Sequence, residues 1–283
     1  MTAMSTRIPN PFERAVAKWR QGQLSTALVT YASRKARQAL RRVRVANFHY
    51  WLDADRVYTK RFGERFGQLS AHHQVYGNYW LDSRLPLGPQ SVVYSLGVGG
   101  DIQFDLAVAE NVQCEVHLYD PTPSSIEFME QQAQIDDAPH KLLRFHPQGA
   151  WDSNTTLRFN VPKRGGSASA VSNESSASFF EAPCITVAEM MKQNGHREID
   201  VLKMDIEGAA ERIVADLLKN GIFPKQLVVE FERPTGSVEV QVAWFQKIEG
   251  LSESLKSHGY EATLLPRDRA RYFGLEILFA RVS

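Results

Sequence analysis

The chain has 283 residues, of which 43% are hydrophobic, and it carries a formal net charge of +1. This length suffices for one large domain with an accessory segment, and the near-neutral charge gives no general case for a nucleic-acid or acidic partner. The sequence has no run of about twenty apolar residues, no apolar signal core and only two cysteines. It therefore predicts a cytoplasmic protein that neither spans a membrane nor is exported.

The expected domains are a basic, aromatic-rich helical extension over residues 1–74 and a main domain over residues 75–283. Residues 1–44 carry ten Lys or Arg against one Glu, and apolar residues recur at three- and four-residue intervals over 24–43. We expect a solvated helix that packs on the main domain or on a second subunit, with weak contact to an anionic membrane surface as the alternative. The aromatics of 47–80 are expected in core packing rather than stacked on bases or sugars.

The main domain alternates regularly between apolar strands and amphipathic helices. We expect strands over 92–96, 115–119, 141–146, 155–160, 199–204, 227–231, 260–265 and 273–280, with helices over 102–110, 124–134, 187–193, 209–219 and 238–257. This order predicts an α/β fold with a doubly wound, mostly parallel sheet. The last strand alternates in hydrophobicity, which indicates a half-exposed antiparallel strand. The Ser-rich stretch 165–178 is expected to be a loop, which could fold over a bound acceptor.

A glycine-rich turn, Ser95-Leu-Gly-Val-Gly-Gly-Asp101, follows the first of these strands and precedes a helix. Glycines at such a position let a cofactor approach the backbone. Asp120 ends the next strand, where a carboxylate can accept hydrogen bonds from both ribose hydroxyls. Together they indicate an adenosine-containing ligand, whereas the alternative is a tight turn plus an aspartate that caps the following proline turn.

The ligand is expected to lack phosphate. Ile102 stands where the dinucleotide fingerprint has its third glycine, and Asp101 stands where a pyrophosphate would lie. An acid there repels phosphate but suits the ammonium of an amino-acid moiety, which S-adenosyl-L-methionine carries. A nucleotide-dependent oxidoreductase is therefore the disfavoured alternative.

Three charged residues, Lys203, Asp205 and Glu207, stand at the exit of the apolar strand 199–204. Open α/β sheets bind ligands outside the carboxyl ends of their strands, and charged residues are rarely buried without partners. The cluster therefore indicates either a ligand site or a salt-bridge network.

These motifs resemble the FkbM-type S-adenosylmethionine-dependent methyltransferases. The resemblance rests on Tyr94-Ser-Leu-Gly-Val-Gly-Gly-Asp-Ile-Gln-Phe-Asp105, on Tyr119-Asp-Pro-Thr-Pro123 and most specifically on Asp200-Val-Leu-Lys-Met-Asp-Ile-Glu-Gly208. It implies a seven-stranded, Rossmann-like class I methyltransferase fold and O-methylation of a sugar, glycan or related secondary metabolite. It also implies site roles by position: Gly97, Gly99 and Asp101 at the methionine end of the cofactor, Asp120 at its ribose, and Lys203, Asp205 and Glu207 facing the acceptor.

Methyl transfer to oxygen requires a base or a metal to remove the acceptor proton. Asp205 is the first candidate for base or metal ligand, Glu207 is the second, and Lys203 is expected to stabilise the developing alkoxide. Glu230, which lies near the end of the following strand, could join Asp205 and Glu207 as an oxygen ligand of Mg²⁺. The alternative is that these carboxylates pair with nearby lysines and arginines.

The remaining candidates complete the expected site. Trp151 is expected near the adenine ring, and His146 is expected to be an exposed turn residue. No acid or cysteine stands at metal-ligand spacing from His72-His73, so this pair is expected to be structural. A small-molecule or glycan acceptor is expected as the partner. An RNA-binding or RNA-methylating protein that uses the basic arm is the further alternative, but the net acidity of the remaining chain opposes nucleic acid.

Overall fold

The computed structural model describes residues 66–161, 178–206, 208–232, 234, 238–266 and 274–283. The predicted helix over 24–43, the Ser-rich loop and Glu207 lie outside these residues. The chain divides into two units, Met1–Glu64 and Arg65–Ser283, and the fold below is that of the second unit. The predicted domain boundary after residue 74 stays a prediction.

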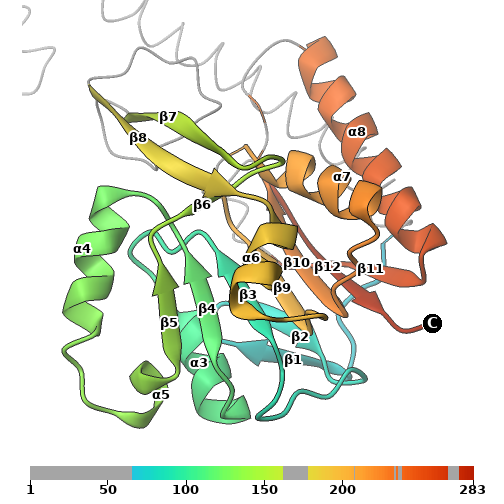
Figure 1. The fold of residues 1–283 in the computed structure, drawn as a ribbon. Helices are drawn as coiled ribbons and strands as arrows, with labels where there is room; N and C mark the ends of the chain where they lie inside the picture. The colour runs from blue at the N-terminus through green and yellow to red at the C-terminus, as the bar shows by residue number, and fades with distance from the viewer. Residues whose placement is uncertain (1–65, 162–177, 207, 233, 235–237, 267–273) are drawn as a thin grey trace, which may run out of the picture. The chain divides into compact units, whose positions relative to one another are not determined.

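The second unit is built on a seven-stranded sheet (Figure 1). Its strands lie in the order β11 (Tyr260–Leu264), β12 (Leu275–Arg281), β10 (Gln226–Phe231), β9 (Val201–Met204), β3 (Val93–Leu96), β4 (Val116–Tyr119) and β5 (Leu143–His146). Neighbouring strands from β10 to β5 are parallel, whereas β12 is antiparallel to both β10 and β11. The predicted doubly wound, mostly parallel seven-stranded sheet is confirmed.

Helices cover both faces of this sheet, which explains why its central strands are apolar at almost every position. On one face, Phe104 and Val108 of α3 (Gln103–Val112) share a core with Val93, Val116 and Val201 of the strands. The opposite face carries α6 (Val187–Asn194), α7 (Ala210–Asn220) and α8 (Val238–Ser257) (Figure 1). The helices α4 (Pro123–Gln132) and α5 (Ala138–Lys141) lie on the α3 side, where Met129 of α4 joins the α3 core and α5 contacts α3. The layers therefore bury both sides of β3, β4 and β9.

A hairpin that the sequence analysis did not predict precedes the main sheet. Strands β1 (His73–Tyr76) and β2 (Tyr79–Asp82) pair antiparallel across a turn in which Gly77 has a φ of +57°. A Cβ atom on Gly77 would lie 2.5 Å from a backbone atom of Gln103, so glycine is required there. Strand β2 contacts β10 and β12. The hairpin therefore covers a face of β12, and the prediction that this strand is half-exposed is wrong, because its central residues are all buried.

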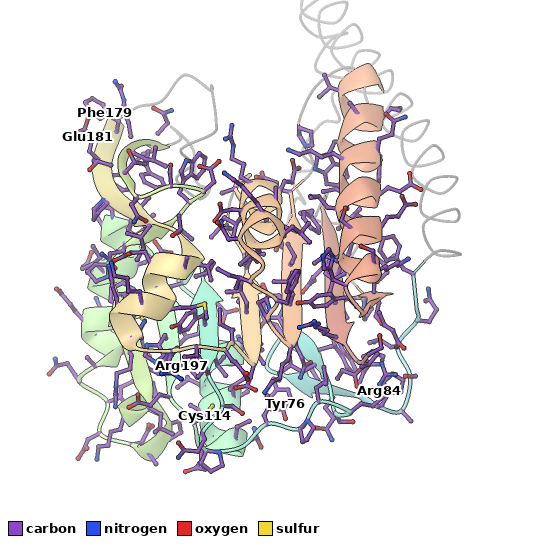
Figure 2. All side chains as sticks on the ribbon, turned by 45° about the vertical axis from the view of Figure 1, so that its right-hand side comes forward. Tyr76, Arg84, Cys114, Phe179, Glu181 and Arg197 are labelled. Atoms are coloured by element: carbon purple, nitrogen blue, oxygen red, sulfur yellow. The ribbon has the colours of Figure 1, made fainter. Side chains whose placement is uncertain are left out.

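A second, three-stranded sheet has the order β6 (Gly149–Ala150), β8 (Ser178–Ile185) and β7 (Thr155–Val161). Of these three strands, only β7 was predicted. In the main sheet, the predicted strand over 141–146 is replaced by the end of α5 and the shorter strand β5. Figure 1 shows this sheet beyond the arrowheads of β4 and β5, and Figure 2 shows Phe179 and Glu181 of β8 at the opposite end of the unit from Tyr76 and Arg84. Among the described helices, none combines the length and apolarity that a membrane crossing needs.

Candidate functional site

Three strand exits meet at the carboxyl edge of the sheet. The N–H of Gly97, just after β3, donates to the carbonyl of Tyr119 at 2.9 Å, and the N–H of Asp205, just after β9, donates to the carbonyl of Leu96 at 2.9 Å. Parallel strands that lie side by side place their exits together, which is where α/β sheets bind ligands. The structure thus brings Gly97, Asp120 and Asp205 to one edge.

The two glycines of the turn differ in what surrounds them. Gly97 has a φ of +87°, and a Cβ atom there would lie 1.9 Å from the carbonyl oxygen of Asp205. Gly99 has a φ of +55°, and a Cβ atom there would meet nothing within 4 Å. Gly97 is therefore required for packing of the turn against the β9 exit, whereas Gly99 leaves open space beside the backbone.

The Asp120 carboxylate is buried and holds the glycine turn in place. Its Oδ2 accepts hydrogen bonds from the N–H groups of Val98 (2.9 Å) and Gly99 (3.1 Å), and its Oδ1 accepts from the N–H and hydroxyl of Thr122 at 2.8 and 2.7 Å. A carboxylate offers about four acceptor positions, so these four bonds use its capacity. Its predicted contact with a ribose stays a prediction, and it would require Asp120 to exchange one of these bonds.

Asp101 is exposed at the entrance to α3. Its Oδ1 accepts the N–H of Gln103, the first residue of α3, at 2.9 Å, and its Oδ2 accepts from the amide nitrogen of Asn78 at 3.4 Å. An exposed carboxylate beside the open turn at Gly99 can receive a cationic group from solution.

Lys203, which lies in β9, and Asp205, which lies just after it, differ in the exposure of their side chains. The Lys203 side chain is 4% exposed, and its Nζ donates to the carbonyl of Gly97 at 2.9 Å. The Asp205 side chain is 46% exposed, and its Oδ2 lies 4.0 Å from the Lys203 Nζ. Lys203 therefore lies beneath the turn, and Asp205 is the charged group of this pair that solvent and ligands can reach.

Tyr79 completes this cluster, and the sequence analysis missed it. Its hydroxyl donates to Asp205 Oδ2 at 2.7 Å, and its ring lies edge-on to Phe104 and 5.2 Å from the Lys203 Nζ. Burial, together with the Asp205 carboxylate, raises the pKa of Tyr79 far above its usual range. The hydroxyl is therefore a permanent donor to Asp205.

Asp105, in the first turn of α3, is a second acid near Lys203. It is 1% exposed, and its Oδ1 has no hydrogen-bond partner among the described residues. Burial raises its pKa, and the Lys203 ammonium offsets part of this rise. The loss of hydration on burial thus raises the pKa of Asp105 more than the attraction to Lys203 lowers it.

Trp151 and His146 lie at the β5 side of the edge. Trp151 is half-buried, and the Arg212 guanidinium lies 5.1 Å from its ring centre and 3.1 Å from the Asp152 carboxylate. His146 is the last residue of β5, with its ring stacked on Tyr119 at 4.4 Å. The expectation that His146 is an exposed turn residue is wrong, because it is half-buried in β5 against His117 and Tyr119 of β4.

Two of the three proposed Mg²⁺ ligands, Asp205 and Glu230, lie among the described residues. Among the described residues, Asp205 and Glu230 share no third His, Cys, Asp or Glu at ligand distance, and Glu207 lies outside these residues. The group that the described residues do form is His72, His73 and Asp82, whose ligand atoms lie within 4.8 Å of one another. Sequence spacing offered no acid partner for His72-His73, but the hairpin register places Asp82 opposite His73.

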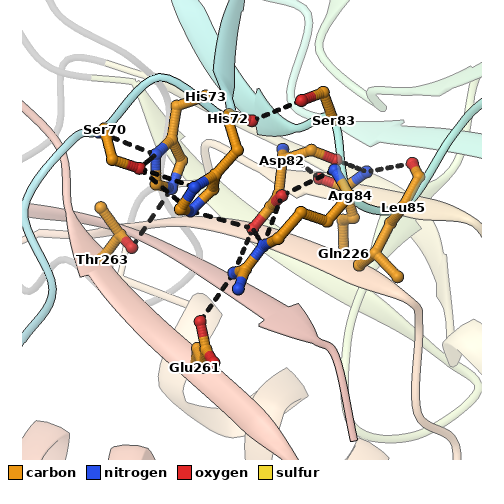
Figure 3. A network of polar contacts seen from close by, with 10 residues as sticks. All are labelled: Ser70, His72, His73, Asp82, Ser83, Arg84, Leu85, Gln226, Glu261 and Thr263. Carbon is orange, nitrogen blue, oxygen red and sulfur yellow. Dashed lines mark hydrogen bonds and ion pairs between the residues drawn. The ribbon is translucent and has the colours of Figure 1, made fainter.

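Other partners already occupy the ligand atoms of that group (Figure 3). Both oxygens of Asp82 accept from the Arg84 guanidinium, with a shortest distance of 2.6 Å, and Nδ1 of His73 accepts the N–H of Ser70 at 3.1 Å. Arg84 also pairs with Glu261 of β11 at 2.6 Å. The group is thus a polar network at the amino-terminal end of the sheet, and it ties the hairpin to β10 and β11.

Comparison with known proteins agrees with this geometry. Residues 82–262, more than half of the chain, match the Methyltransferase FkbM domain. The chain belongs to the FkbM methyltransferase family. The match covers the glycine turn, Asp120 and the β9 exit, and the sheet has the class I methyltransferase arrangement that the resemblance implied, with an antiparallel strand next to its edge.

Individual proteins are more distant from this FkbM-family chain. The human "probable methyltransferase-like protein 24" is 25% identical over 158 residues, which make up 53% of this chain and 36% of the human protein. The crystal structure of FkbM from Methylobacillus flagellatus KT has a TM-score of 0.41 at 12% identity, covering 68% of this chain and 44% of that one. A putative rRNA methylase from Clostridium thermocellum has a TM-score of 0.42 at 8% identity, covering 71% and 92%. The chain thus spans about a third of the human protein and somewhat less than half of the Methylobacillus protein.

Proposed function

We propose that this protein is an S-adenosyl-L-methionine-dependent O-methyltransferase that acts on a hydroxyl group of a sugar, a glycan or a related secondary metabolite. The observation that carries the proposal is the exposed Asp205 carboxylate, which lies at the strand exit packed directly against the glycine turn. A carboxylate at that position can take a proton from an acceptor held beside the cofactor.

The turn suits S-adenosyl-L-methionine better than a dinucleotide. The open side of Gly99 admits a ligand close to the backbone, and the exposed Asp101 carboxylate attracts an ammonium while it repels a pyrophosphate. Trp151 offers an aromatic surface for the adenine ring. S-adenosyl-L-methionine, when bound, supplies the electrophilic methyl group.

In the proposed reaction, Asp205 would receive the proton of the acceptor hydroxyl while the methyl group passes from the sulfonium of the cofactor to the acceptor oxygen. The carbon–sulfur bond breaks as the oxygen–methyl bond forms, and S-adenosylhomocysteine is the leaving product. Among the described residues, only Tyr79 donates a hydrogen bond to this carboxylate, and it does so at Oδ2. Oδ1 is then the atom that faces the acceptor hydroxyl. Lys203 supports the site from below by holding the Gly97 carbonyl and by placing a positive charge near Asp205.

A metal ion has no part in this proposal, because the described residues do not gather Mg²⁺ ligands around Asp205. We propose the cytosol as the compartment. Cys114 and Cys184 are both free and buried, which suits a reducing environment.

The cofactor is tested by calorimetry with S-adenosylhomocysteine, NAD and a short RNA in parallel. Heat only with S-adenosylhomocysteine supports the proposal, whereas binding of NAD alone would replace it with an oxidoreductase. Binding of RNA alone would point to the basic extension as the functional element.

The chemistry is tested with methyl-labelled S-adenosyl-L-methionine and a cell extract. We expect label in a sugar-containing or small-molecule fraction, and we expect Asp205→Asn to reduce its appearance at least about 100-fold, as loss of a general base does. Asp136→Asn is the matched control, since Asp136 is 85% exposed in a surface ion pair with Lys141. Unchanged label with Asp205→Asn would remove this residue from the mechanism, and loss of label on adding a chelator would restore a metal.

A further inference from the structure

A further residue of the proposed site, Tyr79, lies outside the residues that match the family. Tyr79 lies on β2 of the hairpin, and residues 82–262 that match the FkbM domain begin just after it. Its contact with Asp205 joins positions 126 residues apart in the chain. The hairpin thus contributes a side chain to the carboxyl edge of a sheet to which it does not belong.

Tyr79 is held firmly before it touches Asp205. It is 5% exposed, its ring packs edge-on against Phe104 at 5.5 Å, and the Lys203 ammonium lies 5.2 Å from its ring centre. At the other end of β2, the backbone of Asp82 exchanges hydrogen bonds with the buried Gln226 side chain at 2.7 and 3.3 Å. Packing holds the Tyr79 ring, and hydrogen bonds hold the far end of β2. The Tyr79 hydroxyl therefore has a fixed position from which it can orient a partner.

Asp205 needs such a partner because its side chain is half-exposed and follows the end of a strand. Its backbone is fixed by the turn at Gly97, but the carboxylate can rotate about its own torsions. The Tyr79 hydroxyl limits that freedom by binding Oδ2, and among the described residues no hydrogen bond occupies Oδ1. A base held in the correct orientation reacts faster than a mobile one.

From this geometry we propose that Tyr79 is a positioning residue of the methyl-transfer site, which orients Asp205 through the Tyr79–Asp205 hydrogen bond. The inference rests on the proposed function. Removal of the hydroxyl should therefore slow turnover without weakening cofactor binding.

The test is Tyr79→Phe, which keeps the ring and its packing. Label transfer from methyl-labelled S-adenosyl-L-methionine into the cell-extract fraction is followed at increasing cofactor concentration. We expect about a tenfold lower kcat, with an unchanged KM for S-adenosyl-L-methionine and an unchanged affinity for S-adenosylhomocysteine.

Tyr260→Phe is the matched control. Tyr260 is 3% exposed, and its hydroxyl donates to the carbonyl of Pro224 at 2.5 Å, so its loss removes a buried tyrosine hydrogen bond away from this edge. We expect a loss of thermal stability from Tyr260→Phe with no change in kcat. If Tyr79→Phe behaves in the same way, Tyr79 is merely structural and the inference is overturned.

A double-mutant cycle keeps the inference testable where Tyr79→Phe unfolds more easily. If Tyr79 acts through Asp205, the residual rate of Asp205→Asn should not fall further when Tyr79→Phe is added, and the losses of stability should be non-additive. Additive losses in both measurements overturn the inference. The stability cycle needs no substrate, so it separates failure of this inference from failure of the proposed function, which calorimetry with S-adenosylhomocysteine reports.

Discussion

Two aspartates at opposite ends of the sheet are each 1% exposed, yet their environments push them in opposite directions. Asp82, at the amino-terminal end, is surrounded by donors from Arg84. Burial alone would raise its pKa, but the hydrogen bonds from Arg84 outweigh burial and hold the pKa below its usual range. Asp105, at the carboxyl edge, has one oxygen without a partner among the described residues, and burial raises its pKa.

This difference shows which buried acids find all their hydrogen-bond and charge partners within the protein and which do not. The network around Asp82 satisfies each charge within the protein, as expected of a structural region. The carboxyl edge instead combines an incompletely satisfied acid, an exposed acid at Asp205 and an open turn at Gly99. Such departures from local satisfaction are typical of functional sites.

The largest expected effect separates the two glycines of the carboxyl edge. Gly97→Ala should lower the free energy of unfolding by about 3 kcal/mol or more, because its Cβ would overlap the Asp205 carbonyl at a positive φ. Gly99→Ala should cost only about 1 kcal/mol, from its positive φ, but should weaken S-adenosylhomocysteine binding. Urea denaturation and calorimetry measure both. Equal losses of stability would show that the turn is purely structural.

The second-largest expected effect concerns the Asp82 network at the amino-terminal end of the sheet. Asp82→Asn should lower the free energy of unfolding by about 2 kcal/mol at pH 7, discounted because the Arg84 side chain is 37% exposed, and should leave S-adenosylhomocysteine affinity unchanged. Since the folded-state pKa of Asp82 is depressed, its stabilisation is present above about pH 4 and is lost as pH falls further. A difference from wild type that persists at pH 2 would contradict this assignment.

The smallest expected effect is at Asp105, where substitution should raise the free energy of unfolding rather than lower it. Because the folded-state pKa of Asp105 is raised, its contribution to stability is fully present below about pH 4 and is lost as pH rises through the folded-state value. The free energy of unfolding of Asp105→Asn should therefore rise relative to that of the wild-type protein as pH increases from about 4. Chemical denaturation across this range is the measurement. If the variant instead loses stability relative to wild type as pH rises, Asp105 is ionised and paired with Lys203.

Most of the parallel sheet could be predicted because its strands are continuous apolar runs and its helices are amphipathic. The hairpin could not be found from the aromatic stretch that contains it, although Gly77-Asn78 between two short β-prone runs was a usable turn signal. That signal would also have paired His73 with Asp82. The contact between Tyr79 and Asp205 has no local signature, because it joins strands from two different sheets.

The occupancy of the open turn at Gly99 is the most direct test of the account. Calorimetric titration of S-adenosylhomocysteine into the wild-type protein and into Gly99→Ala should give saturable binding to the first and at least about tenfold weaker binding to the second. Absence of binding to the wild-type protein, or equal binding to both proteins, would contradict the assignment of the carboxyl edge as the cofactor site.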